Sequence, residues 1–190
     1  MPKLFILAGC NGAGKTTAAY TILPDVLNIR QFVNADEIAR GLSPFEPESV
    51  ALEAGRMMLN RMNQLLEQQV DFAFETTLST RSYVQTIKRA QQAGYSVTLF
   101  YVWLESVELA KERVAARVAR GGHSIPPEVI ERRYKRSIQN LMTLYLPICN
   151  RTIVVNNSTT ELSPVAECWD GGSKEILDES VWFLMNHHEF

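Results

Sequence analysis

The sequence has no long apolar run, no paired cysteine motif and no overall basic charge. None of its apolar stretches approaches the roughly 18 residues that a membrane-spanning helix needs, so we expect no membrane span. Its three cysteines, Cys10, Cys149 and Cys168, are far apart and form no CxxC pair, which argues against a disulfide framework or a zinc site. Met1-Pro2-Lys3 leads into a short apolar run that no small-residue cleavage site follows, so we predict a cytoplasmic protein without a signal peptide.

The charge is small in total but unevenly distributed. The formal net charge is -2 and the pI is about 6.0, which excludes a broadly basic nucleic-acid or membrane-surface binder. Residues 111–136, hereafter the basic segment, nevertheless hold eight basic and three acidic residues, which leaves the rest of the chain at -7. A concentrated basic segment on an acidic protein indicates a small polyanionic ligand rather than a long one.

Apolar runs alternate with amphipathic stretches along the chain. Continuous apolar runs are typical of strands that are covered on both faces of a parallel sheet. We therefore predict an α/β fold with a three-layer arrangement, a central parallel sheet and a C-terminal β-hairpin, all in one domain spanning residues 1–190. The predicted strands are 4–8, 31–36, 72–74, 97–104 and 151–156, the hairpin is 165–177, and the helices are 15–23, 48–69, 82–93, 107–119, one opening at Pro127 and one from Glu179.

The strongest motif is a glycine-rich loop that follows the first strand and opens a helix. It matches the phosphate-loop pattern of glycine, four residues and Gly-Lys-Thr. Glycines let backbone N–H groups turn toward phosphates, and the helix N-terminus adds its positive end. In such loops the lysine reaches the β- and γ-phosphates and the threonine hydroxyl binds Mg²⁺. We assign ATP phosphate binding to Gly9, Asn11, Gly12, Ala13, Gly14, Lys15, Thr16 and Thr17, Mg²⁺ binding to Thr16, and a catalytic role to Lys15.

Cys10 lies inside this loop near a helix N-terminus, where a reactive thiolate is conceivable. We favour the simpler interpretation that it is a small loop residue.

Two carboxylates are predicted at strand ends on the same edge of the sheet. Asn34-Ala35-Asp36-Glu37 ends the second strand, where Asp36, rather than Glu37, could accept a proton from a substrate hydroxyl or hold Mg²⁺ through water. The alternative is that Asp36 caps the following helix. Residues 74–81 end the third strand in a polar cluster suited to a polyhydroxyl or phosphorylated acceptor. Its proposed acceptor-binding residues are Glu75, Thr77 and Arg81, with Asp36; the alternative is that Thr80 caps a helix and Arg81 is solvated.

The basic segment predicts a lid over residues 117–127. Arg113, Arg117 and Arg120 are at helical spacing, and Gly121-Gly122 supplies a hinge. Arginines on a hinged segment could close on phosphates, because phosphoryl transfer needs cations and bidentate donors. Arg133 and Arg136, which share a face of the next helix, could complete the clamp; a solvated charged face is the alternative for each single arginine. We assign Arg113, Arg117, Arg133 and Arg136 to ATP phosphates and a catalytic role to Arg120.

These motifs together resemble the zeta toxin family of phosphate-loop kinases, in particular its short bacterial branch. The resemblance runs from Phe5 to about Asn157. It rests on the phosphate loop and on residues 34–39 (Asn-Ala-Asp-Glu-Ile-Ala), 74–79 (Phe-Glu-Thr-Thr-Leu-Ser), 120–126 (Arg-Gly-Gly-His-Ser-Ile-Pro) and 130–134 (Ile-Glu-Arg-Arg-Tyr). Larger members commonly have proline at the position of Asn11 and arginine at that of Ser79, whereas here the nearest arginine is Arg81.

The resemblance implies a sheet of strand order 2-3-1-4-5 and a kinase that uses ATP and Mg²⁺. Well-known members transfer the γ-phosphate of ATP to the 3′-hydroxyl of UDP-N-acetylglucosamine. By analogy, Lys15 and Thr16 bind ATP·Mg²⁺, Asp36 is the general base, Glu75 and Thr77 bind the sugar nucleotide, and arginines of the lid and next helix bind phosphates.

Three functional classes follow. The first is a small-molecule kinase acting on a nucleotide sugar or related nucleotide. The second is a nucleic-acid 5′-hydroxyl kinase, against which the acidic remainder and the lack of interleaved aromatic residues count. The third is a non-catalytic ATP-binding switch or a toxin controlled by a partner, such as an antitoxin protein.

Overall fold

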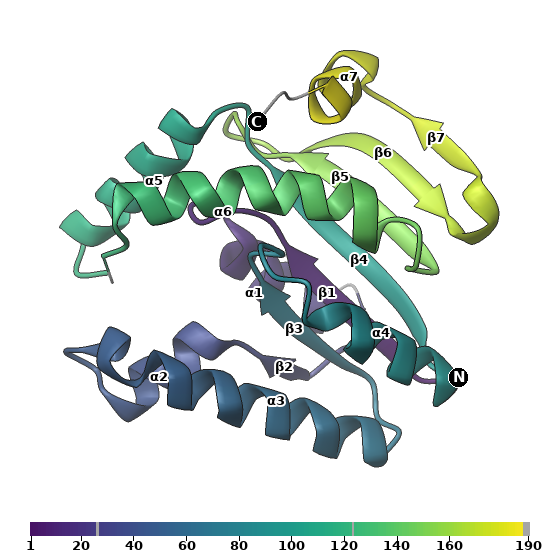
Figure 1. The fold of residues 1–190 in the computed structure, drawn as a ribbon, viewed down its shortest axis with the longest axis horizontal. Coiled ribbons are helices and arrows are strands. Elements are labelled where there is room, and N and C mark those ends of the chain that lie inside the picture. The colour runs from purple at the N-terminus through teal and green to yellow at the C-terminus, as the bar shows by residue number, and fades with distance from the viewer. Residues whose placement is uncertain (26, 123, 188–190) are drawn as a thin grey trace.

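The centre of the molecule is a seven-stranded sheet of order β2-β3-β1-β4-β5-β6-β7 (Figure 1). The computed structural model describes residues 1–25, 27–122 and 124–187. The strands are β1 (Lys3–Ala8), β2 (Gln31–Val33), β3 (Phe72–Thr76), β4 (Ser96–Trp103), β5 (Arg151–Asn156), β6 (Ser163–Trp169) and β7 (Lys174–Ile176). The pairings among β1 to β5 are parallel, and those of β6 with β5 and β7 are antiparallel. The predicted order 2-3-1-4-5 and the C-terminal hairpin are confirmed, and the hairpin extends the same sheet.

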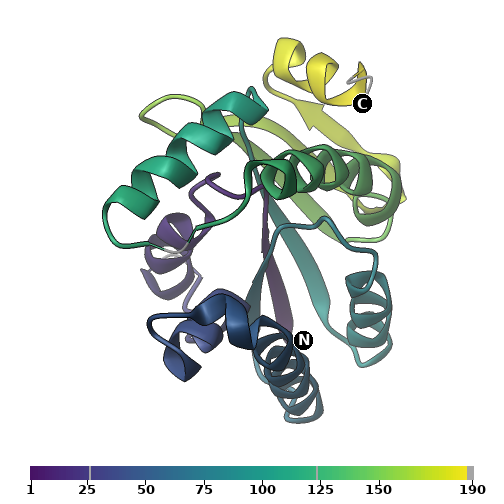
Figure 2. The same cartoon turned by 60° about the vertical axis from the view of Figure 1, so that its left-hand side comes forward.

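Helices cover both faces of the sheet and complete the three-layer arrangement. In Figure 1 helices α4 and α6 lie in front of the sheet, and Figure 2 shows α1 on the opposite side from α4. The α-helices are α1 (Lys15–Asp25), α2 (Ala35–Leu42), α3 (Ala51–Glu67), α4 (Tyr83–Gln92), α5 (Val107–Ala119), α6 (Pro127–Asn140) and α7 (Glu179–His187). Short helical segments are η1 (Pro47–Val50), η2 (Leu141–Tyr145, a π-helix) and η3 (Asp170–Gly172).

The two central strands form the core. Residues 4–8 of β1 are all buried, and so are residues 99–103 of β4, its hydrogen-bonded neighbour. Their continuous apolar sequence is required because helices cover both faces of these strands. Each fully buried Leu, Ile or Phe stabilises the fold by roughly 1.5–3 kcal/mol. The buried strand β1 therefore leads directly into the phosphate loop.

Three predicted boundaries were wrong. Helix α1 continues to Asp25 and contains Pro24 in its last turn, whereas proline was expected to end the helix at Leu23. The predicted strand 31–36 ends at Val33, because the Asn34 side chain caps α2, a helix for which the sequence analysis gave no bounds. The predicted helix 48–69 begins as the 3₁₀ segment η1 and becomes α-helical at Ala51. Within the described ranges, no helix is long and apolar enough to cross a membrane.

Candidate active site

The phosphate loop joins β1 to α1 and depends on its glycines. Gly9 has a φ of 142°, and a Cβ placed there would lie 2.3 Å from the carbonyl oxygen of Val102 on neighbouring β4. Gly14 has a φ of 88°, in the left-handed region that favours glycine. The Asn157 side chain, which follows β5, donates to the Ala13 carbonyl at 2.8 Å. Packing from two neighbouring strands therefore fixes the course of the loop.

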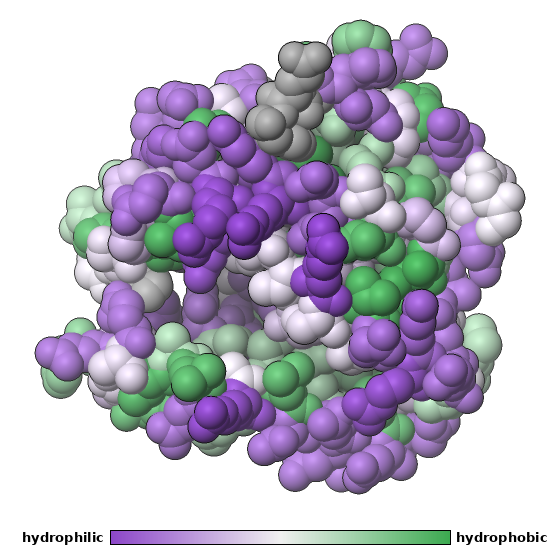
Figure 3. All heavy atoms as spheres, in the orientation of Figure 1, coloured by the Kyte–Doolittle hydropathy of each residue, from purple (hydrophilic) through white to green (hydrophobic). Residues whose placement is uncertain are grey.

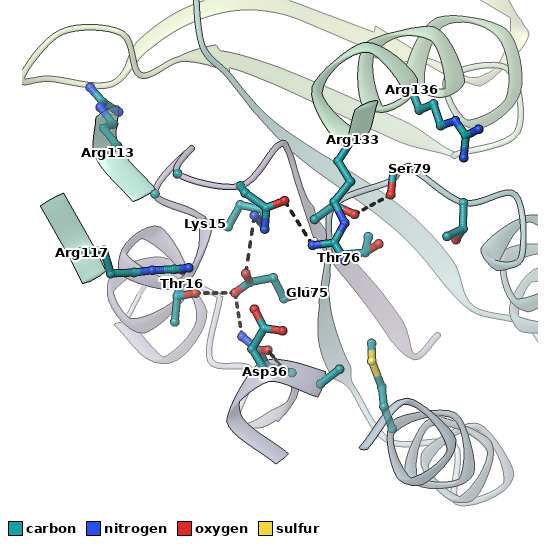
Figure 4. A pocket seen from close by; sticks show the side chains of 18 of the residues that line it. Lys15, Thr16, Asp36, Glu75, Thr76, Ser79, Arg113, Arg117, Arg133 and Arg136 are labelled. Carbon is teal, nitrogen blue, oxygen red and sulfur yellow. Dashed lines mark hydrogen bonds and ion pairs between the residues drawn. The ribbon is translucent and has the colours of Figure 1, made fainter. Parts of the chain in front are cut away.

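Glu75 lies directly beside the phosphate loop, in contact with two of its residues. Its Oε2 accepts from the Thr16 hydroxyl at 2.8 Å, and its Oε1 lies 3.7 Å from the Lys15 ammonium (Figure 4). The Lys15 ammonium also donates to the Cys10 carbonyl at 2.9 Å. This arrangement follows from the sheet order, because β1 pairs with β3 and Leu7 is in register with Glu75. Glu75 was expected in the acceptor site, and the structure joins it to the two residues assigned to phosphate and metal.

Asp36 lies in the first turn of α2 and lines a cavity that Lys15, Thr16 and Glu75 also line. The cap of this helix is Asn34, whose Oδ1 accepts from the backbone N–H of Asp36 at 2.8 Å and of Glu37 at 3.4 Å. The alternative that Asp36 is the cap is therefore wrong, and its carboxylate is available to the cavity. Glu37 instead pairs with Arg40 at 3.1 Å on the helix surface.

The arginines of the basic segment differ in position and in hydrogen-bond partners. Arg133 on α6 reaches across the cavity and donates to the Asn11 Oδ1 at 3.3 Å (Figure 4). Burial lowers the pKa of Arg133, and the Asp36 carboxylate opposes that shift. Arg117, Arg132 and Arg136 also line the cavity.

Two other predicted arginines are placed differently. Arg113 also lines the cavity, but it donates to the carbonyls of Ser158 and Thr159, at 3.2 and 3.5 Å, and points away from Lys15 in Figure 4. Arg120 is exposed at the C-cap of α5 and is not among the described residues that line the cavity, because the helix ends before its side chain can face inward.

The other end of the cavity is rich in hydroxyl groups. Thr77, Ser79, Thr80 and Tyr83, hereafter the hydroxyl cluster, line it together with Met58, and Thr77 and Ser79 are hydrogen-bonded at 2.9 Å. Burial raises the pKa of Tyr83, so its hydroxyl stays protonated at neutral pH. Arg81 is exposed and is absent from the described lining residues, since α4 begins two residues later and turns it outward.

The sequence analysis did not identify Tyr83, Arg132, Asn34 or Asn157. Asn34 carried a recognisable signal, because asparagine before an acidic first turn is a common helix cap. Arg132 lies in the basic segment but was not singled out there, and Tyr83 and Asn157 carried no such signal.

The cavity has a volume of about 540 Å³, and Figure 3 shows the surface hollowed between the region over α5 and α6 and that over α2 and α3. A second cavity of about 360 Å³ shares Asp36, Arg117, Arg132 and Arg133 with the first. Asp36 is therefore placed where the two cavities meet.

The residues at the start of α1 suit a Mg²⁺ ion that is held partly by protein oxygens and partly by phosphate oxygens. Among residues 1–25, 27–122 and 124–187, no group of three His, Cys, Asp or Glu side chains could enclose a metal on its own. The Thr16 hydroxyl and the Glu75 carboxylate nevertheless present oxygen atoms 2.8 Å apart at the N-terminus of α1. Mg²⁺ prefers one or two protein oxygens together with substrate phosphates and water. This pair of oxygens therefore suits it.

Cys10 is fully enclosed beneath the loop. Burial raises the pKa of its thiol to about 11, although the Lys15 ammonium acts in the opposite direction. The thiol is therefore neutral at physiological pH, as expected for a small loop residue.

Of the predicted lid, His123 lies outside the described residues. Residues 117–119 of the predicted lid form the end of α5 and Pro127 begins α6, while Gly121, between the two helices, has a φ of 84°.

A glycine loop between a buried parallel strand and a helix, with a lysine and a threonine at its end, defines a phosphate-loop protein of the kinase fold. The chain belongs to the zeta toxin family, whose family model, described as "Zeta toxin", matches residues 1–164. An uncharacterised protein of Haemophilus influenzae is 33% identical over 132 residues, which cover 70% of this chain and 92% of that protein.

Solved structures support the same fold. A chain of the AvrRxo1-ORF1:AvrRxo1-ORF2 complex with sulphate ions has a TM-score of 0.83 and 18% identity; the match covers this whole chain and 65% of that one. The same complex with ATP gives a TM-score of 0.80. A chain of the PezAT chromosomal toxin–antitoxin system of Streptococcus pneumoniae gives 0.65 at 16% identity, covering 98% of this chain and 85% of that one.

Proposed function

We propose that the protein is an ATP-dependent kinase that transfers the γ-phosphate of ATP to a hydroxyl of a nucleotide sugar, such as UDP-N-acetylglucosamine, or a related nucleotide. The observation that carries the proposal is that one cavity holds both halves of a phosphoryl-transfer site. Lys15 and Thr16 of the phosphate loop lie at one end, the hydroxyl cluster lies at the other, and Asp36 also lines the cavity.

In this mechanism Asp36 accepts the proton of the acceptor hydroxyl. The acceptor oxygen forms a bond to the γ-phosphorus while the bond from that phosphorus to the β,γ-bridging oxygen breaks, and its electron pair leaves with ADP. No covalent intermediate with the enzyme is needed. Mg²⁺ bound by Thr16 and the nucleotide would neutralise phosphate charge.

The lysine and the arginines stabilise the charge that develops on the transferred group. Lys15 must exchange the Cys10 carbonyl or Glu75 for phosphate oxygens, a small movement because its ammonium is already at the loop. Arg133 and Arg117 line the same cavity from α6 and α5, and a guanidinium gives two parallel hydrogen bonds to a phosphate. Positioned cations of this kind are typically worth several powers of ten in rate.

The acceptor class rests on the chemistry of the other end. Four hydroxyl groups and Arg136 suit a ligand that carries both sugar hydroxyls and phosphate. Family membership favours the same class of acceptor.

The direct test is labelling of an acceptor panel with γ-labelled ATP and Mg²⁺. The panel contains UDP-sugars, nucleosides, NAD, free sugars and a 5′-hydroxyl oligonucleotide, with Lys15→Ala as the blank. A labelled UDP-sugar is the expected result. Label on the oligonucleotide would replace the proposal by a nucleic-acid kinase, and ATP binding without any transfer would favour a switch.

Family membership and the toxin–antitoxin likeness also support an antitoxin partner. We expect such a protein, when co-expressed, to copurify with this chain and to lower its labelling activity. Full activity of the copurified complex would contradict inhibitory control.

A further inference from the structure

One amide side chain lies between the two carboxylates of the site. The Nδ2 of Asn34 donates to the Glu75 Oε2 at 2.9 Å, and its Oδ1 accepts the backbone N–H groups of Asp36 and Glu37. Asn34 is only 7% exposed. The same Glu75 oxygen accepts from the Thr16 hydroxyl, so Asn34 connects the phosphate loop, the end of β3 and the start of α2.

The orientation of this amide is fixed by its partners. Backbone N–H groups can only donate, so the atom that faces them must be the amide oxygen, and the amide nitrogen must face Glu75. A carboxylate is a pure acceptor, which agrees with that assignment. Asparagine carries the cap acceptor and the carboxylate donor on two separate atoms, so one side chain reaches both partners at once. Aspartate could cap the helix but would place a second carboxylate against Glu75.

The contact from Asn34 differs in kind from the other two contacts of Glu75. Lys15 and Thr16 are the residues that we assign to phosphate and metal, so both are drawn toward the nucleotide when it binds. Asn34 has no such second task. It is therefore the one of the three that can still hold the Glu75 carboxylate in the loaded site.

We propose that Asn34 is a positioning residue for phosphoryl transfer. It fixes Glu75 beside the metal-binding Thr16 and, through the same amide, fixes the helical turn that carries Asp36. This inference rests on the proposed kinase function. It adds that the separation between the base and the phosphate loop is set by one side chain whose amide oxygen and nitrogen are both engaged by the protein. Misplacement of reacting groups by about 1 Å can cost about 100-fold in rate.

The test separates positioning from capping. Asn34→Ser keeps a capping oxygen but is too short to reach Glu75, so we expect it to fold, with a thermal midpoint close to that of the parent. We expect kcat to fall about 10- to 100-fold, as for other side chains that orient a ligand of a metal site. The KM values for ATP and acceptor should change less than about threefold, because both polar atoms of the Asn34 side chain are engaged by the protein, although the residue lines the cavity. Asn34→Asp is the companion variant, with the cap retained and the donor lost, and should lose at least as much kcat.

A double-substitution cycle supplies the sharper readout. Because Asn34 acts through Glu75, Asn34→Ser should cost little further kcat in a Glu75→Gln background. Additive losses, or a kcat of folded Asn34→Ser equal to that of the parent, would overturn the positioning role while leaving the kinase intact. A parent enzyme that labels no acceptor would overturn the kinase proposal itself and this role with it, so the two failures are distinguishable.

Discussion

Among the individual side chains of the cavity, Asp36 and Glu37 form a natural pair for comparison. They are adjacent on one helical turn, yet Asp36 lines both cavities, whereas Glu37 is among the described lining residues of neither and pairs with Arg40. Replacing each carboxylate by its amide and comparing the rates of phosphoryl transfer therefore distinguishes a catalytic role of Asp36 from a general effect on the helical turn.

We expect Asp36→Asn to lower the rate of phosphoryl transfer by about 100- to 10,000-fold, the usual contribution of a general base. ATP affinity should change little, because the phosphate loop is untouched. Steady-state labelling together with calorimetric ATP titration measures both quantities. Glu37→Gln is the matched control and should retain parental turnover; if Asp36→Asn also does, the assignment of the base is wrong.

Cys10 gives a second prediction for a single side chain. Its thiol is buried and burial raises its pKa to about 11, so below that pH the reactive thiolate is scarce. We expect iodoacetamide to leave Cys10 of the folded protein unmodified at pH 7.5 and to modify it after unfolding in guanidinium. Mass spectrometry of the labelled peptides decides this. Rapid native labelling of Cys10 would show that the loop opens far more often than its packing implies.

At the scale of elements, α6 and the π-helix η2 support the loop between β3 and α4. Asn140 donates to the Leu78 carbonyl at 2.9 Å, and the Tyr145 hydroxyl donates to the Thr80 carbonyl at 2.5 Å. Leu78 has a φ of 59°, an unusual conformation for a leucine, and is fully buried. These contacts hold the backbone that presents the hydroxyl cluster to the cavity.

Tyr145→Phe should therefore affect both stability and acceptor binding. Loss of one hydrogen bond is expected to lower the free energy of unfolding by about 1 kcal/mol. The KM for the acceptor should rise several-fold while that for ATP stays constant, since only the hydroxyl cluster is loosened. Urea unfolding and initial-rate kinetics are the measurements.

Tyr101→Phe is the matched control for this prediction. Tyr101 hydrogen-bonds Ser137 at 2.8 Å in the core, away from the cavity lining. Loss of this hydrogen bond should lower the free energy of unfolding by a similar amount, without a change in the KM for the acceptor. Equal kinetic effects of the two variants would mean that the support of the loop is not specific.

At the scale of the whole molecule, nucleotide binding should stabilise the fold, because the phosphate loop connects the central strand β1 to α1. A ligand at about 100 times its Kd adds about 2.7 kcal/mol to the free energy of unfolding. For a chain of this length that corresponds to a rise of roughly 5–10 °C in the melting temperature. We expect ATP with Mg²⁺ to produce this rise in a thermal-shift measurement.

Lys15→Ala should remove most of that rise, each variant being compared with its own unliganded melting temperature. Lys88→Ala is the control, since Lys88 is an exposed lysine of α4. It should show the parental rise. An undiminished shift in Lys15→Ala would mean that ATP binds elsewhere.

Features that depend on neighbouring residues could be predicted from the sequence, whereas short elements and contacts between distant residues could not. The motif at residues 9–16 could be read directly, because backbone turns and a helix N-terminus are local chemistry. The helix that carries Asp36 was considered only as an alternative and without bounds, because its eight residues follow a three-residue strand and so short an element shows little periodicity. Among the arginines, helical spacing grouped Arg113, Arg117 and Arg120, but it could not show that Arg113 bonds to carbonyls of another loop or that Arg120 follows the end of the helix.

The sequence by itself determined the phosphate loop, the alternation of strands and helices and the basic segment, because each depends on residues close together in the chain. Only the tertiary structure decided that Glu75 meets Lys15 and Thr16, that Arg133 rather than Arg120 reaches the loop, and that Asn34 joins the two carboxylates. Those contacts join residues 41 to 122 positions apart. The contacts of Glu75 and Asn34 exist because the order of the parallel strands brings the ends of β1, β2 and β3 to one edge, and pairing between distant strands leaves no local pattern in the sequence.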